Sequence, residues 1–166
     1  MTYLSKKEFV YTNTLQPNSQ TISTTYQEIT GSKCNIDFKN NTANVLYKSC
    51  FSARYIFNSH SNFSRIYLHV KLQKSNDDFS SNVVDLPGCQ YNFSTESNLS
   101  LQRNGLWTVS SPFFIVENLD SKYLRLVARA YSTSHQGVLN NNQYYDGSSN
   151  PAASIRFDPS VIAMEL

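Results

Sequence analysis

The chain has 166 residues, of which 40% are hydrophobic and 13% aromatic, so it is long and apolar enough to bury one core in a single domain. Charged residues make up only 16%, the formal net charge is only +2, and the basic residues are scattered singly apart from Lys6 and Lys7, so the clustered basic surface that nucleic-acid binding requires is not expected. No stretch approaches the roughly 20 apolar residues of a membrane-spanning helix. The first residues also lack the apolar core of a secretion signal, so synthesis in the cytoplasm is expected.

The beginning of the chain predicts either an N-terminal arm or a first strand, over residues 1–20. Residues 9–12 are β-prone, and residues 16–19 contain a Pro-Asn turn signal that separates them from the next β-prone segment. We expect residues 21–166 to form the main domain.

Two β-prone runs come next, at residues 24–29 and 33–38. The Thr-Gly-Ser segment between them fits a hairpin or a bulged corner. Residues 44–57 then predict a long central strand, in which the odd-numbered residues from Val45 onward share one face.

Residues 65–73 alternate between apolar and polar side chains. Ile66, Leu68, Val70 and Leu72 fall on one side, and the other side is polar or aromatic, which is the period of a half-buried antiparallel strand. Residues 75–101 are then expected to be a long polar excursion, and loops of that length usually carry function or short strands of their own.

Two further strands are predicted at residues 107–117 and 122–132. A tight turn between them predicts that they pair as a hairpin. In the second strand the apolar side is formed by Leu124, Leu126, Ala128 and Ala130. The apolar segment 161–166 is expected to close the chain as a strand inside a sheet, because such a segment would otherwise be a sticky edge.

The fold class is inferred from these elements together. No segment has a convincing 3.6-residue apolar period, so helix content should be small. About eight strands with turn signals between them predict an all-β protein, an antiparallel jelly-roll sandwich in a single domain.

Catalytic residues are hard to assemble from this sequence. The three histidines are His60 and His135, in polar turns, and His69, on the polar side of a strand, where a cross-strand hydrogen bond is the expected role. No nucleotide-binding or nucleophile motif occurs. We therefore expect a protein that is not an enzyme and uses no cofactor.

The three cysteines, Cys34, Cys50 and Cys89, match no zinc motif. A bridge between Cys34 and Cys50 fits an oxidising medium, but free buried thiols are favoured. The acidic pair Asp77 and Asp78 lacks the ordered alternation of a calcium loop, so no metal site is expected.

Two groups of aromatic and charged residues are candidates for contact with partners. The first is the outward side of strand 122–132, where aromatic and guanidinium groups are typical of covered protein surfaces. Its expected subunit-interface residues are Tyr123, Arg125, Arg129 and Tyr131. The second is a candidate recognition loop containing His135, Tyr144, Tyr145 and Asp146. Ordinary sandwich packing and loop tyrosines are the alternative for both.

The chain resembles the trimeric jelly-roll modules of the tumour necrosis factor and complement globular-head type, and more closely small virion proteins of marine phages and algal viruses. The resemblance lies in segments 28–32, 67–75, 87–93, 122–132, 145–148 and 161–166. It implies a trimer packed about an axis and a place on a particle surface as decoration, spike or fibre head.

The function expected from residues and resemblance together is that of a non-enzymatic structural protein of a virion, trimeric and in contact with other virion proteins. The alternative is a carbohydrate- or receptor-binding β-sandwich module, with aromatic loop residues as platforms for a host surface glycan or receptor. Neither interpretation involves nucleic acid or a membrane span.

Overall fold

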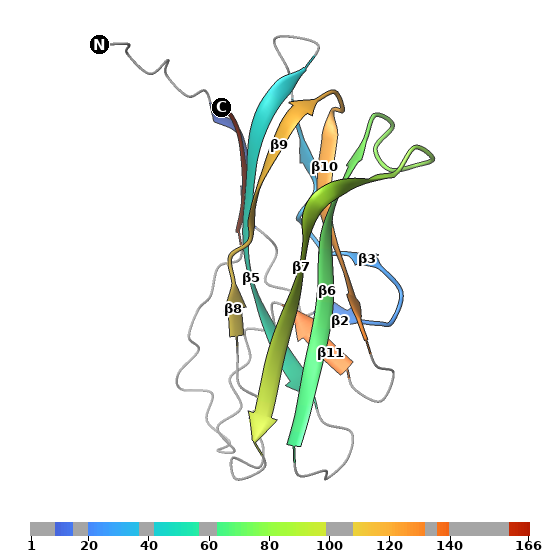
Figure 1. Ribbon diagram of the computed structural model, residues 1–166, viewed down its shortest axis with the longest axis vertical. Helices are drawn as coiled ribbons and strands as arrows, with labels where there is room; N and C mark the ends of the chain where they lie inside the picture. Colours follow the sequence, from blue (N-terminus) through green and yellow to red (C-terminus); the bar gives the residue numbers. More distant parts are fainter. Residues whose placement is uncertain are drawn as a thin grey trace, which may run out of the picture.

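The computed structural model describes residues 9–14, 20–36, 42–56, 63–98, 108–131, 136–139 and 160–166. These ranges form strands and no helix, arranged in two antiparallel sheets that face each other (Figure 1). The strands are β1 (Phe9–Thr14), β2 (Gln20–Ile22), β3 (Gln27–Glu28), β4 (Cys34–Asn35), β5 (Ala43–Ile56), β6 (Phe63–Ser75), β7 (Val84–Asn98), β8 (Thr108–Ser110), β9 (Phe113–Leu119), β10 (Tyr123–Ala130), β11 (Gln136–Leu139) and β12 (Ser160–Glu165). The prediction of an all-β antiparallel sandwich is confirmed.

The long strand β5 is the centre of a seven-stranded sheet. One of its edges pairs with β12 and then β11, and its other edge pairs with β9 and then β8. The strands β1 and β2 extend the sheet beyond β12 and β11. The N-terminal segment therefore contributes a first strand, and the predicted closing strand at the C-terminus lies between β1 and β5, where Val161 and Ala163 are fully buried.

The second sheet has five strands, with β10 near its centre. One edge of β10 pairs with β6 along its whole length, and β7 lies beyond β6. The other edge pairs with the short strands β3 and β4, one after the other.

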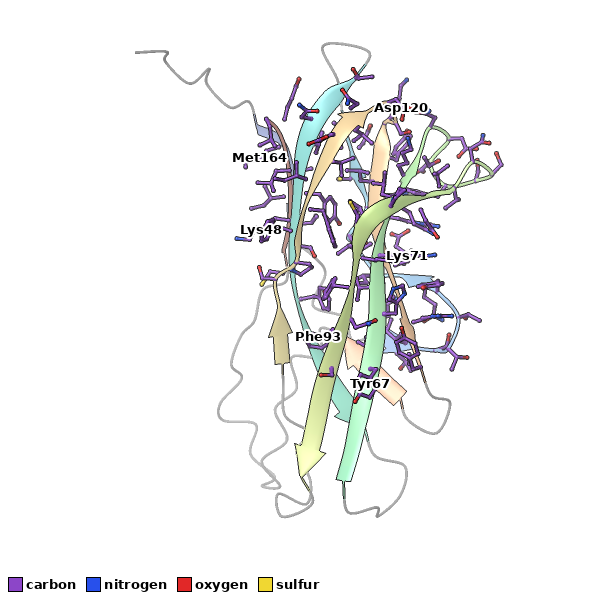
Figure 2. The ribbon with its side chains drawn as sticks, viewed as in Figure 1. Lys48, Tyr67, Lys71, Phe93, Asp120 and Met164 are labelled. Atoms are coloured by element: carbon purple, nitrogen blue, oxygen red, sulfur yellow. The ribbon has the colours of Figure 1, made fainter. Side chains whose placement is uncertain are left out.

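The core forms where the predicted apolar sides of the two sheets meet. Buried residues alternate along β5, β6 and β10 as the sequence indicates, and Leu68, Leu72, Leu124 and Leu126 are fully buried. Phe93 of β7 points between the sheets, as Figure 2 shows, and packs edge-on against Phe51 of β5. The core is thus an apolar layer shared by both sheets.

The predicted hairpin of residues 107–117 with 122–132 is wrong. The strand β9 pairs with β5, whereas β10 pairs with β6, so the turn between them carries the chain from one sheet to the other. Just before this turn, Asn118 of β9 adopts a left-handed φ of 49° beside a register shift with β5, and its N–H donates to Asn44 Oδ1 at 2.9 Å. The polar turn in the sequence predicts that the chain reverses direction. It does not predict whether the next strand joins the same sheet or the opposite one.

The prediction of a long polar loop at residues 75–101 is also wrong for most of that segment. Residues 84–98 form β7, which pairs with β6 from Lys74↔Val84 to Phe63↔Asn98. A polar loop does precede it, held by Asp77, whose carboxylate accepts hydrogen bonds from the backbone N–H groups of Ser81 and Asn82. The side-chain hydrogen bonds from Ser75 and Ser81 lower the pKa of Asp77.

Residues 29–36 form a corner and not a hairpin, because β3 and β4 both pair with β10 and not with each other. Ser32 fills the gap between them: its hydroxyl donates to the carbonyl of Leu126 and accepts from the N–H of Leu126. Gly31 supplies the left-handed φ of 84° that the turn requires. Tyr47 of β5 then donates to the Ser32 carbonyl at 2.6 Å, which ties the corner to the opposite sheet.

Candidate functional site

The outward side of the five-stranded sheet carries a connected set of polar and aromatic side chains, which we call the polar face. It consists of Tyr26, Glu28, Tyr67, His69, Lys71, Gln73, Asp85, Asn92, Arg125, Arg129 and Tyr131. Three of the four predicted interface residues, Arg125, Arg129 and Tyr131, belong to this face, and the ring of the fourth, Tyr123, meets Phe79 edge to face. Whether they contact another subunit stays a prediction.

Tyr26 is the centre of the polar face, although it comes from a distant part of the chain. Two cations lie near its ring, with Lys71 Nζ 3.8 Å and Arg129 Cζ 4.8 Å from the ring centroid. Val127, which faces outward in the same row of the sheet, is only 2% exposed. Because Lys71 pairs with Val127 across the strands, we infer that the Tyr26 ring covers this valine and forms a small second core.

His69 lies beneath the same ring. The Tyr26 hydroxyl and His69 Nδ1 share a hydrogen bond, and the two rings meet edge to face with centroids 5.7 Å apart. Burial, followed by the positive charges of Arg129 and Lys71, lowers the pKa of His69. The lowered pKa favours the neutral form of the histidine.

One half of the polar face is a chain of compensated charges. Arg125 pairs with Glu28 at 3.3 Å and donates to Gln73 at 3.0 Å. Gln73 donates in turn to Asp85, which also accepts from Lys71 at 2.5 Å. Burial alone would raise the pKa of Asp85, but the bonds from Lys71 and Gln73 outweigh it and lower the pKa.

Arg129 differs from the other cations of the polar face. Within the described residues it has no carboxylate partner, and its Nε is buried without a hydrogen bond. Its guanidinium lies near two rings instead, with Cζ 5.5 Å from the centroid of Tyr131 and 4.8 Å from that of Tyr26. An orphaned buried guanidinium N–H is unusual and calls for a physical explanation.

The outward side of the seven-stranded sheet is different, and we call it the apolar face. It consists of Leu46, Cys50, Phe113, Ile115, Ile162 and Met164, around Lys48. Figure 2 shows Lys48 and Met164 on the side of this sheet that faces away from the other sheet. Phe113 is 67% exposed and Ile115 is 56% exposed, the two most exposed large apolar side chains among the described residues.

No pattern in the sequence predicts the apolar face. Residues 113–116 are Phe-Phe-Ile-Val, so both sides of β9 are apolar and alternation cannot separate the buried pair from the exposed pair. Only the pairing of Phe113 with Lys48 and of Ile115 with Leu46 reveals that these residues share an outward side.

The described residues contain no group of three or more histidine, cysteine or acidic side chains that could hold a metal ion. Cys34 and Cys89 are buried free thiols, and burial raises the pKa of Cys34 to about 12. Cys50 is also free but only half-buried. Over the same described ranges, no helix has the length and apolar character needed to cross a membrane.

The predicted recognition loop lies outside the described residues, since His135, Tyr144, Tyr145 and Asp146 all fall between the described ranges. The two sheet faces are therefore the surfaces on which contacts can be located.

Comparisons with known proteins identify no family for this chain. No protein-family profile matches the chain, and no curated protein matches it. Among solved structures, the chain is similar to dimeric latent PorU from Porphyromonas gingivalis, with 12% sequence identity and a TM-score of 0.39. The match covers 95% of this chain and 11% of that chain, so the present chain spans a small part of the length of PorU. At this TM-score the likeness carries no argument about function.

Proposed function

We propose that the chain is a non-enzymatic structural protein of a virus particle surface that self-associates, as a trimer, through the apolar face. The observation that carries self-association is the exposure of Phe113 (67%) and Ile115 (56%) on one side of a sheet. Exposed apolar groups gathered on one face of a soluble domain usually mark a protein contact. The assignment to a virion and the trimeric state both rest on the resemblance described for the sequence.

The strand order supports the jelly-roll part of this proposal. The paths β1–β12–β5–β9 and β3–β10–β6–β7 place most chain neighbours in opposite sheets, with β6 and β7 as a chain-consecutive pair within one sheet. Such crossing between two sheets of about four main strands is typical of a jelly roll.

The apolar face is a better candidate for subunit contact than the outward side of β10. On the outward side of β10, Arg125 already has partners within the chain: it pairs with Glu28, and its Cζ lies 4.1 Å from the centroid of Phe79. Burying these charged groups in an interface would remove water from charges that already have partners, so it would contribute little to the free energy of association. Covering Phe113 and Ile115 removes apolar surface from water, which is favourable.

The test is the mass of the purified chain at micromolar concentration, measured by light scattering or sedimentation. We expect a trimer, and we expect Phe113→Glu to yield monomers with unchanged β-type circular dichroism. Val84→Glu is the matched control, because Val84 is 48% exposed and lies on β7 of the other sheet. A monomeric parent, or a Phe113→Glu variant that assembles like the parent, would contradict the proposal.

A second variant separates the two faces. If β10 forms the interface, as the sequence analysis predicts, Arg129→Glu should abolish assembly while Phe113→Glu leaves it intact, since a charge reversal in a desolvated contact is strongly unfavourable. The proposal expects the reverse pattern.

A further inference from the structure

We propose that the polar face contains a binding site for an acidic saccharide, a sugar ring that carries a carboxylate or a sulfate, formed by Tyr67, Tyr131, Arg129 and Asn92. This inference is independent of self-association, because the site lies on the sheet opposite the apolar face.

The first feature of the site is an aromatic shelf. Tyr67 of β6 and Tyr131, directly after β10, lie opposite each other, and the Tyr131 N–H donates to the Tyr67 carbonyl at 3.1 Å. Their side chains are 44% and 53% exposed. The Tyr131 hydroxyl is held by Asn92 Oδ1 at 3.2 Å, which limits rotation of the ring. Figure 2 shows Tyr67 on the outer side of this sheet, away from Phe93 in the core.

The second feature is the uncompensated charge beside the shelf. Each other cation of the polar face has an acidic partner: Lys71 pairs with Asp85, and Arg125 pairs with Glu28. Among the residues that the structure describes, Arg129 has no acidic partner; its guanidinium lies near the rings of Tyr26 and Tyr131, and its Nε is buried without a hydrogen bond. Because Arg129 is only partly buried and no carboxylate of the described residues pairs with it, its guanidinium is a candidate partner for an anion from solution.

The two features together select the class of ligand. The apolar C–H side of a sugar ring stacks on tyrosine, and an acidic substituent on that ring would then lie beside the guanidinium. Asn92 offers further polar atoms for sugar hydroxyls next to the shelf. A neutral sugar would use the shelf and leave Arg129 unpaired, so acidic sugars should bind more tightly.

A nucleic acid also combines flat rings with negative charge, but the structure disfavours it. Useful affinity for a nucleic acid needs several phosphate contacts, whereas Arg129 is a single uncompensated cation of the polar face and the whole chain has a net charge of +2. One anion at one guanidinium fits one acidic sugar.

The experiment is calorimetric titration of the full chain with sialyllactose, a sulfated galactose disaccharide, neutral lactose and a thymidine oligonucleotide. We expect at least one of the two acidic sugars to bind about tenfold more tightly than lactose, which is the effect of one charge-assisted hydrogen bond. The comparison of sialyllactose with the sulfated sugar decides between carboxylate and sulfate. Arg129→Gln should remove the preference for acidic over neutral sugars. Tyr131→Ala should weaken the binding of both kinds of sugar.

Lys33→Gln is the matched control for charge, because it removes the same positive charge from an exposed pair with Asp78, beside the far end of β10. It should leave binding unchanged. If Arg129→Gln is poorly folded by circular dichroism, Tyr131→Ala and Tyr67→Ala decide the question. The proposal is overturned if neither acidic sugar binds more tightly than lactose, if binding does not depend on Arg129 or the two tyrosines, or if the oligonucleotide alone shows that dependence. Phe113→Glu should bind the sugar as a monomer. Sugar binding can therefore be tested whether or not the chain self-associates through the apolar face.

Discussion

Two buried serines provide a sharp test of how the corner between β3 and β4 is held. Ser32 is fully buried, and its hydroxyl accepts from the Leu126 N–H at 3.0 Å and donates to the Leu126 carbonyl at 3.1 Å. The carbonyl keeps a second partner in the Ile29 N–H, at 2.9 Å. Ser32→Ala would therefore leave the Leu126 N–H buried without that partner.

The expected cost of Ser32→Ala is about 1–3 kcal/mol, the penalty for one buried unsatisfied donor. For a domain of this size, that corresponds to a Tm lower by about 3–9 °C. The measurement is urea unfolding observed by circular dichroism, at one fixed protein concentration because self-association would add to the apparent stability.

Ser49 supplies the matched control, with the opposite sign. It is 1% exposed, and its Oγ has no hydrogen-bond partner among the described residues. Ser49→Ala removes a buried polar atom that makes no hydrogen bond to the described residues. The free energy of unfolding should therefore stay the same or rise by about 1 kcal/mol. If both alanine variants shift the urea midpoint equally and in the same direction, the role assigned to the Ser32 hydroxyl is refuted.

Three further predictions concern titration, the loop and the terminus. The pKa of His69 is lower in the folded chain than the unfolded value of 6.5, so the free energy of unfolding should be highest above about pH 6.5 and fall below it. His69→Gln should make the urea midpoint less dependent on pH in that range. An unchanged slope would contradict this. Asp77→Ala should speed amide hydrogen exchange at Ser81 and Asn82, whose N–H groups it binds, and exchange at the parental rate would count against the loop assignment. Deletion of residues 161–166 should give an insoluble or unfolded product, because β12 pairs with both β1 and β5; a soluble product with the parental Tm would show that this strand is dispensable.

The strands that could be predicted are those whose two sides differ in polarity. The buried sides of β5, β6 and β10 can be identified because apolar residues recur at every second position over eight residues or more. The pattern does not predict strand β7, because about half of its residues are Asn, Ser, Thr or charged and its apolar residues Cys89, Tyr91 and Phe93 lie together near its middle. Its strand conformation comes from pairing with β6, which is a tertiary effect that local propensity does not contain.

The same distinction explains how much of the polar face was predictable. Alternation places Arg125, Arg129 and Tyr131 on one side of β10, and the structure agrees. Tyr26 lies 43 positions before His69 in the chain and reaches it only through the pairing of β3 with β10. No spacing in the sequence connects those two residues, so the covered valine and the orphaned guanidinium beside it could only be found in three dimensions.

The edges of the sheets bear on how copies of this chain can meet. Within the described residues β7 pairs only with β6 and β9 only with β5, so both present an outer edge to which another strand could be added. Each edge is interrupted: β7 contains Pro87 and Gly88, with a left-handed φ of 75° beside a register shift, and Pro112 separates β8 from β9. Proline cannot donate to a new strand, and a bulge turns the edge away from a partner. Strand addition is thereby disfavoured at β7 and at β9. A change at the edge residue Val84 is therefore expected to leave assembly intact, whereas Phe113→Glu on the apolar face is expected to produce the monomer.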